Sequence, residues 1–167
     1  TTTPSPGDGG STSTGREVVF TYDSAAVREI LLRGQLMGRQ LNRFSKISDG
    51  EGHSGHYLTG FDVNDYDLAG YSQYQSVVDY YAGSWVHMGP AVQANFQIHD
   101  WRDPAWSDPA ICNPNEDPVA CEVRTWNPSV AMIYLRTKGW EVSFETAYYP
   151  ELKELCEYLI AQGVVPV

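Results

Sequence analysis

The stretch Ser129–Gly139, SVAMIYLRTKG, decides the fold of this chain. Its residues Val130 to Leu135 form a short, unbroken and largely apolar run, and a polar segment follows at Arg136–Gly139. A continuous apolar run of this length is typical of a strand buried on both faces, as in a parallel sheet. Ligands of such sheets bind beyond the carboxyl ends of the strands, so a site is expected at Arg136–Gly139.

The segment that follows has the pattern of a helix and then a second strand. Pro150 suits a first helical turn, and Gly163 suits the position just after the last turn. Between them, apolar residues recur at helical spacing at Leu152, Leu155, Cys156, Leu159 and Ile160. Val164–Val167 then begins a strand. The sequence therefore predicts a βαβ unit and an α/β fold with about four parallel strands.

Further elements are predicted earlier in the chain. Helices are expected from Asp23-Ser24 to Gly34 or Gly38, over Ser72–Ala82, and from Asp117-Pro118 to Trp126. Strands are expected over Phe44–Ser48 and Ala91–Phe96. Loops are expected over Tyr57–Tyr71 and Trp101–Asn115.

Length and composition indicate one globular domain with a tail. The 167 residues suffice for one hydrophobic core, and 42% of them are apolar. Residues 1–15 contain only Thr, Ser, Pro, Gly and one Asp, which predicts a linker or stalk before a domain over residues 16–167. The net charge of −10 argues against nucleic acid and anionic membranes as partners, and no apolar run has the length of a membrane span.

The three cysteines point to an oxidising compartment. Cys112 and Cys121 flank the segment CNPNEDPVAC, and we expect a local disulfide between them, two unpaired thiols being the alternative. Cys156 lies on the apolar stripe of the last predicted helix, where a buried free thiol is expected. Because disulfides persist outside the cytosol, an extracellular or cell-surface location follows.

The predicted strand Val164–Val167 stands at the end of the chain. A parallel strand on an open sheet edge exposes unpaired backbone groups. We therefore expect this edge to be covered, either by sequence beyond Val167 or by another chain, for example in a homo-oligomer. The fold as given is expected to be incomplete at its C-terminal end.

Several segments together resemble a bacterial branch of the SGNH (GDSL-type) hydrolase-like family. They are FSKISDG (44–50), FDVNDYDLAGY (61–71), VVDYYAGSW (77–85), DPAWSDPAICNPNEDPVACEVR (103–124) and PSVAMIYLRTKG (128–139). They occur in the family's order and cover most of residues 25–167. The resemblance implies a flavodoxin-like, three-layer α/β/α sandwich with a mainly parallel sheet.

The resemblance also implies where a catalytic site would stand. The family's serine nucleophile falls on Gly50, its oxyanion-hole glycine on Asn95 and its oxyanion-hole asparagine on Lys138. Its Asp-x-x-His block would lie beyond Val167. Glycine offers no nucleophile, and a mobile lysine is not a preorganised amide donor. The implied function is therefore that of a non-catalytic extracellular domain acting as a structural, assembly or binding module.

The alternative is a secreted serine esterase or carbohydrate esterase with a displaced nucleophile. Ser48 is the fallback nucleophile and Ser54 a second candidate, with the general base supplied beyond the chain. An ordinary loop serine is the favoured interpretation of both.

Metal sites are not favoured, and no cofactor is expected. His53 and His56 lack a clear third zinc ligand, and the acidic segment Asp62–Asp67 lacks the glycine and glutamate of a calcium loop. His99-Asp100 has no nucleophile beside it and is interpreted as a surface pair.

The aromatic residues are the candidate binding groups. Tyr57, Tyr71, Trp101, Trp106 and Trp140 are placed in predicted loops or at the ends of elements. Exposed rings there would stack on a polysaccharide or pack against another subunit, whereas about half of the aromatic residues are expected to fill the core.

Overall fold

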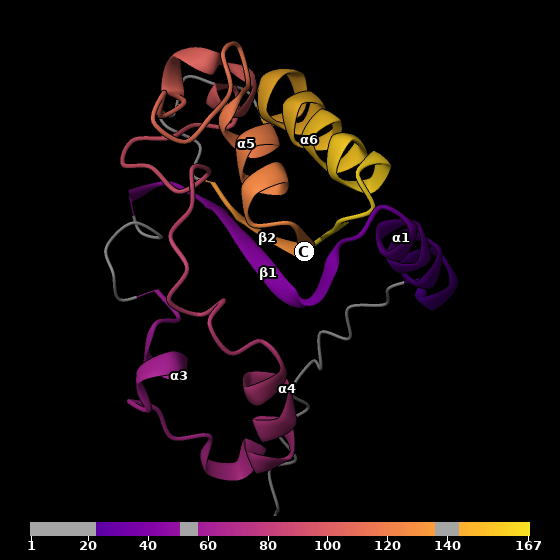
Figure 1. Cartoon of the computed structure of the whole chain (residues 1–167), viewed down its shortest axis with the longest axis vertical. Coiled ribbons are helices and arrows are strands. Elements are labelled where there is room, and N and C mark those ends of the chain that lie inside the picture. Colours follow the sequence, from indigo (N-terminus) through magenta and orange to yellow (C-terminus); the bar gives the residue numbers. More distant parts are fainter. Residues whose placement is uncertain (1–22, 51–56, 136–143) are drawn as a thin grey trace, which may run out of the picture.

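The computed structural model describes residues 23–50, 57–135 and 144–167, omitting the side chains of residues 144 and 145. Its centre is a parallel sheet of three strands in the order β1-β2-β3 (Figure 1). The strands are β1 (Gln40–Ser48), β2 (Pro128–Tyr134) and β3 (Val165–Pro166). The α/β class is therefore confirmed, with three strands rather than four in the described residues.

Strand β2 is central, as the sequence predicts, but one of its faces is only partly covered. Ala131 and Leu135 are buried, whereas Val130 is half-buried and Tyr134 is 44% exposed. The prediction of a strand buried on both faces is therefore wrong. The reason is that α5 (Pro118–Thr125) and α6 (Tyr149–Ala161) cover one face, while α1 (Ser24–Leu36) and α4 (Gln75–Tyr80) flank the other (Figure 1).

The βαβ unit of the sequence analysis is present. Helix α6 joins β2 to β3, and these two strands pair in parallel. Pro150 lies in the first turn of α6, and Gly163 takes a left-handed conformation with φ 70° just after its last turn. Cys156 is free, as predicted, but half-buried rather than buried.

Helices α1 and α5 begin at the predicted caps and end close to the predicted positions. Asp23 caps α1 and Asp117 caps α5, each by accepting from backbone N–H groups. The remaining short elements are α3 (Gly60–Val63), the 3-10 helices η1 (Ala69–Tyr74), η2 (Asp100–Arg102) and η3 (Pro104–Trp106), and a π-helical turn, η4 (Phe144–Tyr148), before α6.

Four predictions on bounds are corrected. The segments Tyr57–Tyr71 and Trp101–Asn115 contain short helices and are not plain loops. The helix predicted over Ser72–Ala82 starts inside η1 and becomes α-helical only at Gln75. Ala91–Phe96 forms no strand, because only a single bridge joins Val92 to Ser48 of β1.

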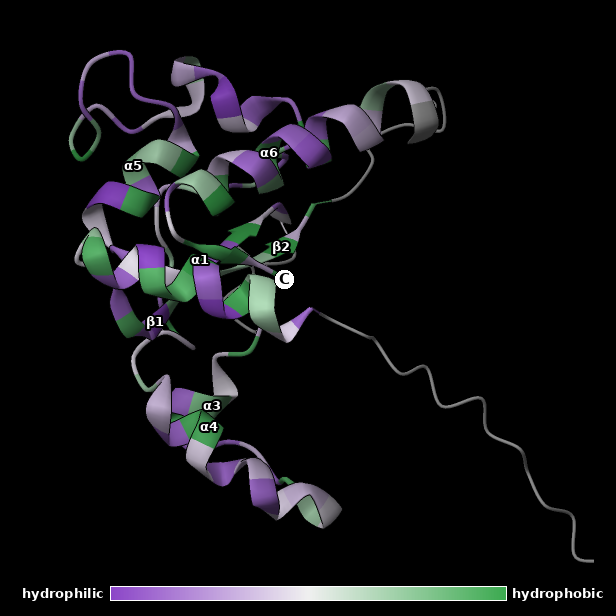
Figure 2. Cartoon of the chain, turned by 90° about the vertical axis from the view of Figure 1, so that its right-hand side faces the viewer, coloured by the Kyte–Doolittle hydropathy of each residue, from purple (hydrophilic) through white to green (hydrophobic). Residues whose placement is uncertain are grey.

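The core lies between the sheet and the pair α5 and α6. It comprises Ile47, Ala91, Phe96, Ile98, Trp101, Val119, Val123, Ala131, Leu135, Leu155, Leu159 and Val164. Figure 2 shows β2 as largely hydrophobic beneath α6. A disulfide between Cys112 and Cys121 fixes the loop before α5 to that helix, as predicted, with the two Cα atoms 5.3 Å apart. None of the helices in the described residues is long and apolar enough to cross a membrane.

Helix α1 crosses the turn between α6 and β3 at two glycines. A Cβ atom added to Gly34 would lie 2.3 Å from the carbonyl oxygen of Gly163, well inside van der Waals contact. Gly34 is also the buried residue of α1. This close approach positions α1 beside β3, so it also sets one wall of the groove described below.

We predict that Gly34→Ala lowers the free energy of unfolding by about 1–3 kcal/mol, since the added methyl group forces backbone apart. Alanine is otherwise the better helix former, so a stabilised variant would show that the contact is not tight. Gly70→Ala is the matched control, because a Cβ at Gly70 meets nothing within 4 Å. Urea denaturation of both variants measures the difference.

Candidate functional site

The carboxyl edge of the sheet brings together two of the positions that the family resemblance singles out. The backbone N–H of Ser48 donates to Ala91 O at 3.0 Å, and the Gln93 N–H donates to Ser48 O at 3.1 Å. A Cβ on Gly50 would lie 4.0 Å from the Cα of Ala94, the neighbour of Asn95. Asn95 itself has a left-handed backbone, with φ 67°. Lys138 lies outside the described residues.

Ser48, the fallback nucleophile, is buried at this edge. It is 1% exposed, and its hydroxyl donates to the carbonyl oxygen of Asp49 at 3.4 Å. The imidazoles in the described part of the chain have carboxylate partners instead: His87 pairs with Glu122 and His99 with Asp100. No hydrogen bond joins a serine hydroxyl to an imidazole among these residues. Ser54 and the predicted zinc pair His53 and His56 lie outside them.

A serine, a histidine and a glutamate do meet elsewhere, in a cluster that sequence reasoning missed. Glu122 of α5 is 1% exposed, and its Oε1 accepts from Ser45 Oγ of β1 at 2.5 Å. The same oxygen lies 2.8 Å from His87 Nε2. Because the carboxylate stands between them, the imidazole makes no contact that would let it take a proton from Ser45. The cluster ties α5 to β1 and to the segment before Gly89.

Both sides of this cluster are tightly packed. The His87 ring stacks on the Trp126 ring, with 3.8 Å between the two ring centroids. The Arg43 guanidinium lies 4.4 Å from the centroid of the Trp126 ring. Glu122 Oε2 is buried without a hydrogen-bond partner. A Cβ added to Gly89 would lie only 1.7 Å from that oxygen. Glycine at position 89 is therefore required by the buried carboxylate.

We predict that Glu122→Ala lowers the free energy of unfolding by about 3–5 kcal/mol, because it leaves the buried Ser45 hydroxyl and the half-buried His87 imidazole without their shared partner. Glu122→Gln is expected to cost less, since the amide oxygen can still accept from both groups. Glu157→Ala is the control, since its side chain is 63% exposed and pairs only with Lys153 among the described residues. Equal denaturation midpoints for Glu122→Ala and Glu157→Ala would contradict the role of the cluster.

A buried lysine holds two loops against β1. Lys46 is 1% exposed, and its Nζ donates to Trp85 O at 2.7 Å and to Tyr57 O at 3.3 Å. Burial lowers the pKa of Lys46, and the charge of Asp62 opposes that shift. Asp62 in turn accepts from the backbone N–H groups of Gly83 and Val86 at 2.8 and 2.9 Å.

Backbone contacts occupy two acidic side chains of the segment Asp62–Asp67, which was considered above as a calcium loop. Both carboxylate oxygens of Asp62 accept backbone hydrogen bonds, Asn64 ends α3 in a left-handed conformation, and Asp67 accepts from the Ala69 N–H. In the described residues, the one cluster with ligand-like spacing is Cys112, Glu116 and Cys121. Its two sulfurs are bonded to each other, and Glu116 pairs with Arg124, so the cluster is not a metal site.

The five candidate aromatic residues separate into different environments. Trp101 is only 2% exposed and packs in the core, so the prediction that it binds a ligand at the surface is wrong. Trp106 packs against Phe96, and Tyr57 stacks on Tyr134; both are half-buried. Tyr71 is 66% exposed. Trp140 lies outside the described residues.

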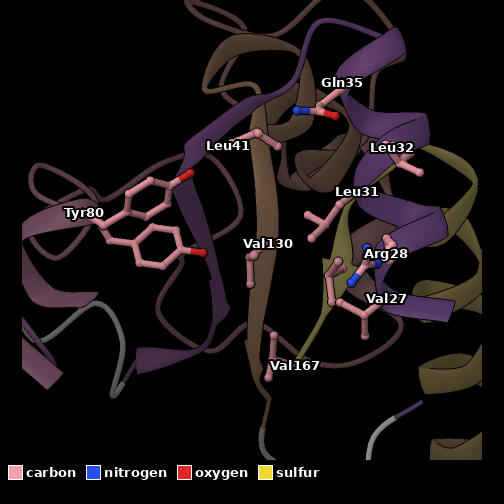
Figure 3. Close-up of a pocket in the computed structure, with 11 residues that line it drawn as sticks. Val27, Arg28, Leu31, Leu32, Gln35, Leu41, Tyr80, Val130 and Val167 are labelled. Carbon is pink, nitrogen blue, oxygen red and sulfur yellow. The ribbon is translucent and has the colours of Figure 1, made fainter. Parts of the chain in front are cut away.

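An apolar groove lies on the incompletely covered face of the sheet, and we call it the sheet groove (Figure 3). It has a volume of about 440 Å³. It is lined by Val27, Arg28, Leu31, Leu32, Gln35, Leu41, Tyr80, Tyr81, Val130, Val165 and Val167. Its floor includes Leu41, near the amino end of β1, and Val130, near the amino end of β2, so it lies away from Ser48 and Tyr134 at the carboxyl ends of these strands.

The predicted edge strand is short and ill suited to pairing. The N–H and C=O of Val167 bond to β2, which directs the backbone of Pro166 to the open side. Proline has no N–H to donate, so this edge resists the addition of a strand. Val164, which was predicted to be part of the edge, is fully buried in the core. The groove, rather than the edge, is therefore the available surface.

Comparisons with family models, with curated proteins and with solved structures found no match to this chain. The function must therefore be argued from the site itself.

Proposed function

We propose that this chain is a non-catalytic extracellular binding module with an SGNH-like fold. The sheet groove carries the proposal, because an apolar cavity of about 440 Å³ has the size of a ligand pocket, roughly 300–1,000 Å³. Exposed apolar residues on both of its walls, such as Leu32 at 54% and Tyr80 at 49%, extend this surface. The flavodoxin-like three-layer arrangement is part of the proposal, with α1 and α4 as the elements of the second outer layer.

The geometry of the carboxyl edge of the sheet supports the proposal that the module is non-catalytic. The position that the resemblance assigns to the nucleophile is Gly50, and the nearby hydroxyl of Ser48 is buried and bonded to a backbone carbonyl. Activation of a serine needs a base within hydrogen-bond reach. The disulfide Cys112–Cys121 supports the extracellular location, because such bonds persist in oxidising compartments.

We predict that a fluorophosphonate probe leaves the intact mass of the protein unchanged, since no activated serine is expected. Ser48→Ala is the companion variant, and its mass spectrum and thermal stability under the same treatment should match those of the parent chain. A single stoichiometric adduct that maps to Ser48 or Ser54 would overturn the proposal in favour of a secreted esterase.

A second candidate function, glycan binding, is favoured by one surface feature. Tyr71 and Tyr74 stack with their centroids 6.4 Å apart and are 66% and 54% exposed. The same lobe, residues 57–82, contains an open polar pocket of about 390 Å³ lined in part by Asn64, Asp67 and Gln75. Aromatic rings beside amide and carboxylate groups match the apolar faces and hydroxyl groups of sugars.

If the lobe binds glycans, the double variant Tyr71→Ala, Tyr74→Ala should weaken binding to a polysaccharide by about tenfold or more. Tyr149→Ala is the control, because Tyr149 is 54% exposed on α6 and lies outside the lobe. Affinity electrophoresis through gels containing soluble glucans or chitin fragments provides the measurement. Equal retardation of all variants would reject the lobe as the binding surface.

A further inference from the structure

The sheet groove combines an apolar interior with one cation at its rim. Seven of its lining residues are Val or Leu, contributed by α1 and by residues in or beside the three strands. Its polar members are the Arg28 guanidinium and the Gln35 amide on the α1 wall and the phenol group of Tyr80 opposite (Figure 3). The phenol group of Tyr81 also lines the groove. An apolar interior with a few polar groups at the rim is the pattern of a small-molecule site.

Arg28 is the charged residue among the described residues that line the groove. Among the described residues, no ion pair or hydrogen bond joins its guanidinium to a carboxylate, and the adjacent acid Glu29 pairs with Arg33 at 3.3 Å. In the part of the chain that the structure describes, the groove is lined by no acidic side chain, although the chain carries a net charge of −10. The groove is thus a locally cationic, apolar site on an acidic protein.

We propose that the sheet groove binds a single-chain amphiphile with an anionic head group, of the long-chain carboxylate class. The alkyl chain lies over Leu41, Val130 and Val165, where it removes apolar surface of the strands from water. The carboxylate accepts from the guanidinium of Arg28, whose planar fork fits such a group. This inference rests on the proposal that the chain is a binding module.

Charge and edge geometry favour this occupant over a second copy of the chain. Two copies would each bring a net charge of −10 to the contact, which opposes association at low salt. Strand addition at β3 is opposed by Pro166, as described above. The cationic side chain at its rim and its volume of about 440 Å³ instead fit a small anionic ligand.

The test compares dodecanoate with dodecanol, its uncharged counterpart, by isothermal titration calorimetry on the full chain below micelle-forming concentrations. We expect dodecanoate to bind more tightly and the preference to decrease by about fivefold to thirtyfold in Arg28→Gln, the factor that one or two kcal/mol produces. Dodecanol binding should be unchanged by this variant. Arg33→Gln is the matched control, because it lies on the same helix, pairs with Glu29 and does not line the groove.

A second variant tests the apolar half of the site without disturbing the core. Val167→Asp places a carboxylate at the end of the groove at a residue that is 72% exposed. We expect it to abolish the binding of both probes, while circular dichroism and the melting temperature stay close to those of the parent.

Four results would overturn the inference. Failure of dodecanoate to bind at millimolar concentration excludes the ligand class. Equal affinities for dodecanoate and dodecanol, each unchanged by Arg28→Gln, exclude the anionic head group. A higher affinity for dodecanoate in the variant Phe20→Asp would assign the groove to residues 16–22 of the chain itself. An affinity for dodecanoate that falls as the protein concentration rises would assign the groove to a second copy of the chain. A fluorophosphonate adduct with intact dodecanoate binding would reject only the non-catalytic function, so the two failures are distinguishable.

Discussion

The parallel pairing of β1 with β2 is the constraint on which the rest of the structure depends. The two strands are separated by nearly eighty residues, and their register runs from Phe44 opposite Val130 to Ser48 opposite Tyr134. A parallel pair cannot be closed by a tight turn, so the intervening chain must cross from one end of the sheet to the other. This crossing contains both the α3–α4 lobe and α5. The pairing therefore fixes where the lobe leaves the sheet and where α5 returns to it.

Polar groups lock that crossing in place from inside the protein. The end of α5 is joined to β1 by the Trp126 indole N–H, which donates to Phe44 O, and by the Glu122 cluster. The Lys46 ammonium donates to the backbone at Tyr57, where the lobe begins, and at Trp85, shortly after the lobe ends. Arg39 bonds to the last turns of α5 and α6 through Val123 O and Gln162 O. Removing one member of such a buried polar contact is costly, because its partner then stays buried without a hydrogen bond.

The two ends of the sheet consequently have different chemistry. The carboxyl end is closed by the segment around Ala91–Asn95, and Ser48 is buried beneath it. The amino end is open on one face, because α1 stands to the side at the Gly34–Gly163 contact and α4 belongs to the lobe. An α/β domain would ordinarily be searched for ligands at its carboxyl edge. Among the described residues, the apolar sheet groove of about 440 Å³ lies near the other end, and it supports the proposal of a binding role there.

The sequence by itself determined the local elements. The apolar run at Val130–Leu135, the helical spacing of Leu155 and Leu159, the caps at Asp23 and Asp117, and the left-handed Gly163 all follow from short-range preferences, and the structure contains each of them. The pairing of Cys112 with Cys121 also followed from their proximity in the chain.

Only the tertiary structure decided which side chains meet and which face of the sheet stays open. Ser45, His87 and Glu122 are far apart in sequence, and nothing local marks Glu122 as buried. Trp101 became a core residue and Tyr71 an exposed one, although both were assigned to loop-like segments with the same chemistry. The physical reason is that burial depends on long-range packing, whereas periodicity reports only the faces of a single element. The sheet groove likewise exists because helices far apart in the sequence flank the sheet without covering it.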